Sequence, residues 1–192
     1  MAVTAVVFDV GETLVDETAM WERAADAAGV PRFTLMGVLG GLAARGERHS
    51  RVWDIVGVES PATSWDGEGF YPDALPCLDR LRADGFRVAA VGNTPQATEE
   101  ALGRHVDVLG SSERWGVAKP AAAFFERILV ELGEEPGAVA YVGDRVDNDV
   151  KPALHVGMAA VHLRRGPWGL LHDSPAEGIS INSLDELPAA LP

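Results

Sequence analysis

Residues 3–14 read Val-Thr-Ala-Val-Val-Phe-Asp-Val-Gly-Glu-Thr-Leu, and this stretch decides the fold. Its first part, from Val3 to Phe8, is β-branched and almost entirely apolar, and it stops at Asp9. A short, nearly continuous apolar run predicts a strand that is buried on both faces, as in a parallel sheet. The acidic residue that follows is then expected at the carboxyl edge of the sheet, where open α/β proteins bind their ligands.

Four similar apolar runs follow, and patterns typical of helices separate them. The further strands are predicted at residues 87–91, 106–109, 138–142 and 159–163, and the helices at residues 72–85, 120–133 and 148–156. Strands that alternate with helices imply parallel pairing. The prediction is an α/β fold with a doubly wound, Rossmann-like parallel sheet of about five strands. After the fifth strand we expect a loop over residues 164–180 and a short terminal helix over residues 183–191.

Residues 17–71 break this alternation, and no buried strand is found among them. They contain three helical patterns and then a polar, Gly-rich stretch, at residues 19–28, 33–45, 49–56 and 61–69. A connection of this length is too long for an ordinary α/β loop. We therefore expect a small helical cap over residues 17–71, inserted after the first strand into a core made of residues 1–16 and 72–192.

Three aspartates are expected to meet at the carboxyl edge of the sheet. Asp9 follows the first strand directly, Asp144 follows the fourth after one glycine, and Asp149 lies five residues further on. A single aspartate after a strand is more often a helix cap. Several carboxylates that converge in one crevice repel each other and need a cation, and hard oxygen ligands suit Mg²⁺. The pattern therefore predicts a magnesium site.

Four short motifs resemble those of the haloacid dehalogenase-like (HAD) hydrolase superfamily. Residues 8–14 (Phe-Asp-Val-Gly-Glu-Thr-Leu) are similar to its first motif, Asp-x-Asp-Gly-Thr-Leu after a strand. Residues 143–149 (Gly-Asp-Arg-Val-Asp-Asn-Asp) match the fourth motif, Gly-Asp-x-x-x-x-Asp. Residues 119–120 (Lys-Pro) resemble the third motif, and residues 91–94 (Val-Gly-Asn-Thr) lie where the second falls. The family's helical cap also lies between the first and second motifs.

This resemblance implies a hydrolase that transfers a phosphoryl group to Asp9. The aspartyl-phosphate formed there would split one hard hydrolysis into two displacements. Lys119 would pair with Asp9 and with the phosphoryl oxygens and keep the carboxylate ionised. The cofactor would be Mg²⁺, held by Asp9, the backbone carbonyl of Gly11, Asp144 and Asp149. The phosphate would be bound at Gly11, Gly92, Asn93 and Thr94.

Two positions depart from the family's motifs. The family's phosphatases carry a second Asp, the general acid and base, where this chain has Gly11, and a Ser or Thr where it has Gly92. Neighbours on an extended segment point to opposite sides, so Glu12 is a poor replacement for the missing Asp. Thr94 offers a hydroxyl two residues after Gly92. General acid–base catalysis is worth about 10²–10⁴-fold, so its loss slows transfer without abolishing it.

These departures leave other functions open beside the hydrolysis of a small phosphorylated metabolite. Gly11 and Gly92 fit a catalytically weakened module that binds a metal or a phosphorylated ligand in a regulatory role. A dehalogenase-like activity is a further alternative, although dehalogenases carry a tyrosine at the place of Gly11 and work without metal. Phosphonoacetaldehyde hydrolases require a cap lysine, and Lys119 and Lys151 are the only lysines of the chain.

The composition of the chain indicates which binding partners and which cellular compartment to expect. The chain has 16 basic and 29 acidic residues and a formal net charge of −13, which disfavours nucleic acid and anionic membranes as partners. The single cysteine, Cys77, excludes an intramolecular disulfide framework and fits a reducing compartment. The N-terminal apolar stretch ends at Asp9, too early for a leader, and no run approaches the roughly 18 residues of a membrane span. We expect a cytoplasmic protein, and a homodimer stays open.

Two groups of residues fit two interpretations each. In the predicted cap, three tryptophans and four basic residues either line a pocket for an anionic substrate or form core and a solvated face; they are Trp21, Trp53, Trp65, Arg45, Arg48, His49 and Arg51. Beyond the last predicted strand, Arg164, Arg165 and Trp168 border the same crevice and contact either the substrate or a second subunit.

Overall fold

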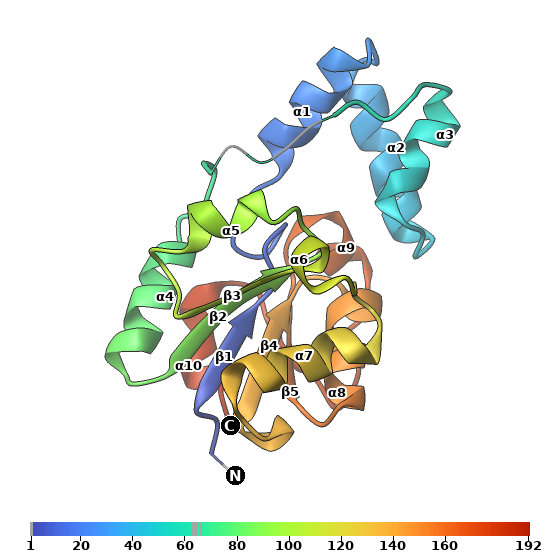
Figure 1. The fold of residues 1–192 in the computed structure, drawn as a ribbon. Coiled ribbons are helices and arrows are strands. Elements are labelled where there is room, and N and C mark those ends of the chain that lie inside the picture. Colours follow the sequence, from blue (N-terminus) through green and yellow to red (C-terminus); the bar gives the residue numbers. More distant parts are fainter. Residues whose placement is uncertain (1, 63–64, 66) are drawn as a thin grey trace.

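Strand β1 (Ala5–Phe8) lies in the middle of the sheet in the computed structural model, which describes residues 2–62, 65 and 67–192. The six-stranded sheet has the order β3-β2-β1-β4-β5-β6, and every neighbouring pair is parallel. Because β1 pairs with both β2 and β4, the strand order reverses there, and the crevice for a ligand lies at the carboxyl ends of these strands. Figure 1 shows helices on both sides of the sheet, and both chain termini at the end opposite the inserted helices.

The core elements alternate along the chain as the sequence predicts. The other strands are β2 (Arg87–Gly92), β3 (Val108–Ser111), β4 (Val139–Gly143), β5 (Ala159–Leu163) and β6 (Ile179–Ile181). The α-helices are α4 (Ala74–Ala83), α5 (Ala97–Leu102), α6 (Ser112–Trp115), α7 (Ala122–Leu132), α8 (Lys151–His155), α9 (Gly166–Leu171) and α10 (Leu187–Ala190). Short 3₁₀ or π turns are η2 (Pro136–Ala138), η3 (Val146–Val150) and η4 (Leu184–Glu186).

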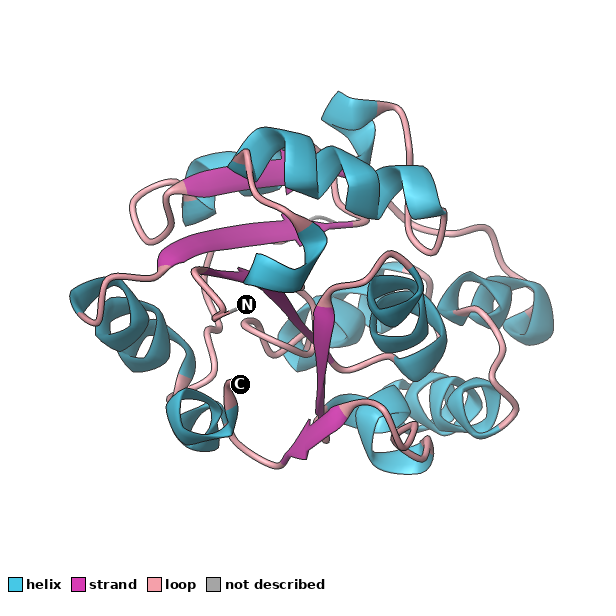
Figure 2. Ribbon diagram, turned by 90° about the horizontal axis from the view of Figure 1, so that it is seen from below, coloured by secondary structure: helices cyan, strands magenta, loops and turns pink. Residues whose placement is uncertain are grey.

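The strands are mostly apolar because both faces of the sheet are covered (Figure 2). In β1, Val6 and Phe8 pack on one face with Leu78 and Leu81 of α4. Ala5 and Val7 alternate with them and belong to the cluster on the other face, which includes residues of α7 and α8. The alternation holds β1 between two hydrophobic layers, so the backbone that carries Asp9 is buried and rigid.

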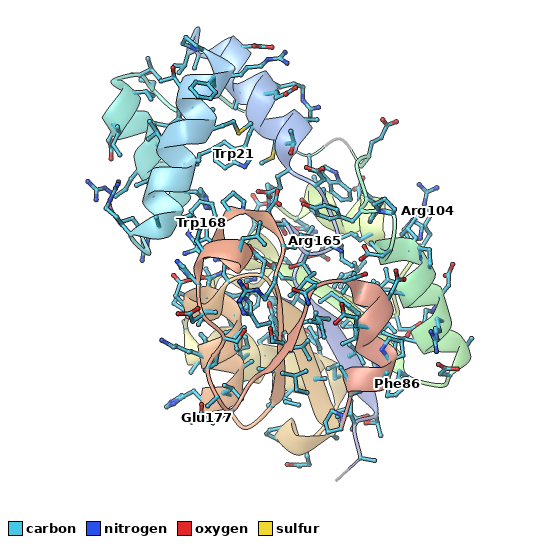
Figure 3. All side chains as sticks on the ribbon, turned by 180° about the vertical axis from the view of Figure 1, so that it is seen from behind. Trp21, Phe86, Arg104, Arg165, Trp168 and Glu177 are labelled. Carbon is cyan, nitrogen blue, oxygen red and sulfur yellow. The ribbon has the colours of Figure 1, made fainter. Side chains whose placement is uncertain are left out.

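The insertion after β1 is helical. It consists of α1 (Thr18–Ala27), α2 (Arg32–Ala44), η1 (His49–Arg51) and α3 (Val52–Val56). Its buried residues form a hydrophobic cluster of their own, which also takes in Trp168 from α9 of the core. Through this tryptophan and the contact between α2 and α9, the inserted helices pack on the core. Figure 3 shows Trp168 at the end of the core that faces them.

The chain leaves and re-enters the core at one point. Val15 forms an antiparallel bridge with Phe70. The amide of Asp16 donates to the carbonyl of Gly69 at 2.9 Å, and the amide of Tyr71 donates to the carbonyl of Leu14, also at 2.9 Å. The two connecting segments therefore run side by side next to the end of β1.

The structure differs from the sequence prediction mainly near the C-terminus. The loop predicted over residues 164–180 is wrong, because this region contains α9 and ends in β6, which is the sixth strand of the sheet. Strand β3 begins at Val108, two residues later than predicted. The predicted terminal helix is η4 followed by α10, and Ser183 caps it by accepting a hydrogen bond from the amide of Asp185. No helix among the described residues has both the length and the apolar character needed to cross a bilayer.

Candidate active site

Lys119 bridges two aspartates at the carboxyl ends of the central strands. Asp9 follows β1, and Asp149 lies in η3 beyond β4. The Nζ atom of Lys119 lies 2.6 Å from Oδ1 of Asp9 and 2.6 Å from Oδ1 of Asp149. All three residues are buried, and the Lys119 side chain is only 1% exposed. An ammonium group this deep in a protein needs such partners, because desolvation of an unpaired charge is costly.

Asp149 approaches β4 so closely that only glycine fits beside it. A Cβ atom on Gly143 would lie 2.6 Å from both Cβ and Cγ of Asp149. The second oxygen of Asp149, Oδ2, accepts a hydrogen bond from the amide of Arg145 at 3.0 Å, and Oδ1 also accepts from the Tyr141 hydroxyl at 3.3 Å. Both oxygens of Asp149 are thus engaged by protein donors, and this carboxylate positions Lys119.

The charges of the site are strongly coupled. Burial alone would lower the pKa of Lys119, but the charges of Asp149 and Asp9 outweigh it and raise this pKa well above its usual value. Burial, together with the charges of Asp149 and Asp9, raises the pKa of Asp144 well above its usual range. Burial is also the main cause that raises the pKa of Asp149, against the opposing charge of Lys119. One lysine therefore does not balance three buried carboxylates.

The carboxylates of Asp9, Asp144 and Asp149 form a group that fits a divalent cation. One oxygen from each residue lies within 4.8 Å of the others. No hydrogen bond or ion pair to the Asp144 carboxylate is found among the described residues, although this residue is 3% exposed. A buried, unpartnered carboxylate beside Asp9 is a ligand set of hard oxygens, which suits Mg²⁺. His162 supports the backbone here, since its Nε2 lies 3.0 Å from the carbonyl oxygen of Asp144.

The segment that follows β2 holds Lys119 from the other side. Oδ1 of Asn93 accepts from the amide of Lys119 at 2.8 Å, and Nδ2 of Asn93 donates to the carbonyl of Lys119 at 3.0 Å. The side chain of Asn93, expected at the phosphate, is thus used to fix the lysine backbone. A Cβ atom on Gly92 would lie 3.1 Å from Cγ2 of Thr94 and 3.4 Å from Oδ1 of Asp9. Thr94 therefore presents its methyl group, not its hydroxyl, to the place of the missing Ser or Thr.

The turn after Asp9 directs Glu12 away from the crevice. Glu12 has a left-handed φ of 52°, and its amide donates to the carbonyl of Val15 at 2.8 Å. Its carboxylate accepts from the amide of Glu17 at 3.0 Å and from the hydroxyl of Tyr71 at 2.8 Å. Glu12 consequently ties together the two segments that connect the insertion to the core.

Glu17 was not among the residues expected at the site, yet its carboxylate lies over Gly11. A Cβ atom on Gly11 would lie 2.8 Å from Cδ of Glu17 and would overlap with its Oε1. The indole Nε1 of Trp21 donates to Oε2 of Glu17 at 3.2 Å. Burial raises the pKa of Glu17 to about 7, with a further contribution from the neighbouring charge of Glu12.

A cavity of about 850 Å³ opens from Gly11, Asn93 and Thr94 into the inserted helices. Its wall there is largely aromatic and apolar, and includes Met20, Trp21, His49, Trp53 and Trp65. Trp21 stacks on Trp53 with ring centroids 6.3 Å apart, and Figure 3 shows Trp21 on the side of the insertion that faces the core. No arginine or lysine lines the cavity among the described residues.

Three of the arginines singled out by the sequence serve other purposes, namely Arg45, Arg51 and Arg165. Arg45 and Arg51 both pair with Glu47 on the exposed side of the insertion. Arg165 pairs with Asp73, donates to the carbonyl of Thr13 at 3.0 Å and lies over the ring of Tyr71. Trp168 packs into the cluster of the inserted helices, as described above. Arg165 and Trp168 thus join parts of this one chain.

The sequence therefore located Asp9, Lys119, Asp144 and Asp149, which the structure brings together, but missed Tyr141, His162 and Glu17. Tyr141 carries a detectable signal, because it is a polar-tipped residue in an otherwise apolar strand two positions before Gly143. The position of Glu17 has no local signal, because it depends on the turn at Glu12.

Solved structures with known chemistry share this fold. A HAD phosphatase from Thermococcus onnurineus superposes with a TM-score of 0.64 at 23% identity, over 98% of this chain and 97% of that one. A dehalogenase with an intermediate complex superposes with a TM-score of 0.75 at 22% identity, over 99% and 97% of the two chains. At these identities the likeness establishes the α/β fold and does not distinguish the two reactions.

Sequence comparison adds relatives with named activities. Glyceraldehyde 3-phosphate phosphatase of Methanocaldococcus jannaschii is 36% identical over 123 residues, which are 61% of this chain and 54% of that protein. The protein of the same name from Methanopyrus kandleri is 38% identical over 104 residues, 51% of this chain and 45% of that protein. The chain spans about half the length of these curated relatives.

The family itself is shown by a wider match. The sequence model of haloacid dehalogenase-like hydrolases matches residues 3–157, a stretch that includes Asp9, Lys119 and residues 143–149. Most of the chain is covered, from the first strand to the helix after the fourth. The chain belongs to the haloacid dehalogenase-like hydrolase family.

Proposed function

We propose that this protein is a Mg²⁺-dependent phosphatase that hydrolyses a small phosphorylated metabolite through an aspartyl-phosphate on Asp9. The observation that carries the proposal is the buried ion pair of Lys119 with Asp9 and Asp149, at the point where the cavity reaches the sheet. The core comprises residues 1–16 and 72–192, and residues 17–71 form the cap. The phosphatase names of the sequence relatives support the same reaction class.

Asp9 is the nucleophile in this proposal. Its Oδ1 is held by Lys119, which leaves its other oxygen to attack phosphorus. Lys119 also offsets the negative charge of the phosphoryl oxygens. Asp149 and Asn93 act as positioning residues, one on the ammonium group and the other on the backbone of Lys119. The phosphate is bound by amides near Gly11 and Gly92 and by the segment of Asn93 and Thr94.

Mg²⁺ would be held by Asp9, Asp144 and the backbone carbonyl of Gly11, with Asp149 beside it. When bound, it would neutralise charge on the phosphate and on the crowded carboxylates. The support for this assignment is the buried carboxylate of Asp144, which has no protein partner among the described residues.

The test is the hydrolysis of 4-nitrophenyl phosphate with Mg²⁺ by the unaltered protein and by Asp9→Asn. We expect Asp9→Asn to lower kcat by about 10³-fold or more, since the covalent route is lost. We also expect EDTA to remove activity and Mg²⁺ to restore it. The matched control is Asp84→Asn, at an exposed position after α4, which should leave kcat unchanged. Equal turnover by Asp9→Asn and the unaltered protein would contradict the assignment of the nucleophile.

The glycines at positions 11 and 92 favour a second candidate, a weakened module that binds phosphate without turnover. In that case neither protein would hydrolyse the ester, while isothermal titration would still detect binding of inorganic phosphate. A dehalogenase-like activity would instead release halide from a 2-haloacid without Mg²⁺. Halide release in EDTA therefore separates this third candidate from the phosphatase.

A further inference from the structure

The space beside Gly11 is occupied by a carboxylate from another part of the chain. Glu17 is the residue at the N-terminus of α1, six positions after Gly11. Its Oε1 and Cδ take the place where a side chain at position 11 would begin. Replacement of Gly11 by any larger residue would require Glu17 to move. The absence of a side chain at Gly11 therefore leaves the space that the Glu17 carboxylate occupies.

We propose that Glu17 is the general acid and base of the phosphatase reaction. This inference rests on the proposed function, because it assigns the proton transfers of the reaction at Asp9. A phosphate monoester of an ordinary alcohol has a poor leaving group, so efficient cleavage needs a proton donor in reach of the bridging oxygen. Glu17 lines the cavity next to Gly11, where the ester oxygen of a phosphate bound at Asp9 would lie.

The hydrogen bonds of Glu17 leave one oxygen for this task. Oε2 accepts from the indole of Trp21 at 3.2 Å, which fixes the plane of the carboxyl group. Oε1, the atom nearest to Gly11, has no hydrogen-bond partner among the described residues. The backbone of Glu17 is held as well, since its amide donates to Oε1 of Glu12. A catalytic group should be oriented by hydrogen bonds from its neighbours in this way.

Of the other acidic groups near the crevice, Asp144 is assigned to Mg²⁺, and four more do not meet these requirements. Glu12 is engaged by Tyr71 and by the amide of Glu17. Asp149 is bonded through both oxygens. Asp54 and Glu59 also line the cavity, but they are exposed residues of the cap, and the three atoms nearest to a Cβ on Gly11 all belong to Glu17. Glu17 is the carboxyl group of the cavity wall that reaches the first turn after β1.

The reaction takes place in two displacements at phosphorus. The carboxylate of Asp9 forms a bond to phosphorus, the bond from phosphorus to the ester oxygen breaks, and protonated Glu17 gives its proton to that oxygen to release the alcohol. Water then attacks phosphorus of the aspartyl-phosphate and gives one proton to the Glu17 carboxylate. The bond from phosphorus to the Asp9 oxygen breaks, and inorganic phosphate leaves. Glu17 is again protonated, and Asp9 is again a carboxylate.

The experiment compares Glu17→Gln with the unaltered protein on two esters that differ in leaving group, glycerol 1-phosphate and 4-nitrophenyl phosphate, with Mg²⁺. For glycerol 1-phosphate we expect kcat/KM to fall by about 10²–10⁴-fold, because the alcohol needs the proton. For 4-nitrophenyl phosphate we expect the rate of the first step to fall less than about tenfold, since this leaving group needs little protonation. The second step still lacks its base, so a burst of 4-nitrophenol and an accumulated phosphoenzyme are expected.

The control is Glu22→Gln, on the same helix, whose carboxylate pairs with Arg32 away from the cavity. This variant should hydrolyse both esters at the rate of the unaltered protein. An equal loss of activity on the two esters, with no burst, would mean that Glu17 has a structural role and would overturn the proposal. Full activity of Glu17→Gln with inactive Asp9→Asn would overturn this inference alone, whereas full activity of Asp9→Asn would overturn the proposed function.

A relocated carboxylate gives a second test. Glu17→Ala removes the group, and Gly11→Asp with Glu17→Ala supplies one from the other side of the same space. We expect kcat/KM of the double variant for glycerol 1-phosphate to be at least about tenfold higher than that of Glu17→Ala. Gly11→Asp alone would require the end of the Glu17 side chain to move. A folded double variant that is no more active than Glu17→Ala would contradict the assignment.

Discussion

The strand-end crevice and the cap cavity adjoin at Gly11, but different kinds of side chain line them. Around Asp9, charges and hydrogen bonds hold Lys119 by its side chain and by its backbone. In the cap, the wall combines aromatic and apolar side chains, such as the stacked pair of Trp21 and Trp53, with acidic and hydroxyl groups but no arginine or lysine among the described residues. In the proposed function, the crevice holds the phosphate group that all phosphate esters share, and the cap contacts the part in which they differ.

The largest expected effect comes from Lys119→Met, which tests the charge balance of the crevice. We expect kcat/KM to fall by at least about 10³-fold for every ester, because charge stabilisation of the transferred group is lost. Without Mg²⁺, the protein should also lose about 3–5 kcal/mol of unfolding free energy, since a buried ion pair loses its cation. Ester kinetics and urea unfolding in EDTA measure the two effects. Lys151→Met, at an exposed position, is the control. A Lys119→Met protein that keeps a tenth of the unaltered activity would refute the charge argument.

A smaller effect is expected from Gly143→Ala, which tests the packing that places Asp149. The new Cβ atom would lie 2.6 Å from Asp149, so we expect a loss of about 1–3 kcal/mol in unfolding free energy and reduced activity. The control is Gly37→Ala in α2, where no atom lies within 4 Å of the new Cβ. That variant should gain about 0.5–1 kcal/mol from helix propensity. Equal urea midpoints for the two variants would show that Gly143 is not a packing requirement.

The smallest effect is expected from Met20→Ala, which tests the separate role of the cap. Met20 lines the cavity, and its removal should change the ratio of kcat/KM between a bulky aryl ester and a small alkyl ester by about tenfold. Inhibition by inorganic phosphate should stay the same, because the crevice is unaltered. Val130→Ala, exposed on α7, provides the control. A parallel loss for both esters and for phosphate inhibition would mean that the two regions do not act separately.

The crevice was predictable because its residues are fixed by strand ends. Asp9 and Asp144 follow continuous apolar runs, and the carboxyl ends of parallel strands meet at one edge. Lys119 stood out because the chain has one other lysine. The placement of Asp9 and Asp144 therefore followed from local pattern and topology, whereas the placement of Lys119 beside Asp9 was implied by the resemblance to the HAD family.

The remaining features depend on contacts that no local pattern encodes. Helix α9 was missed because Trp168 is buried against the inserted helices, which are far away in the sequence. Strand β6 was missed because it is a three-residue edge strand that forms by pairing with β5. Glu17 was missed because the left-handed conformation of Glu12 turns the chain back over Gly11.

The bridge between Val15 and Phe70 bears on how the inserted segment can be replaced, in evolution or by protein engineering. Since the two ends of the insertion meet as neighbouring strands do, a segment of any length can be exchanged there without stretching the sheet. Asp9, Lys119 and Asp144 would keep their positions when a new segment is grafted. It would also have to cover the apolar side of Trp168 and supply its own residue at the place of Glu17.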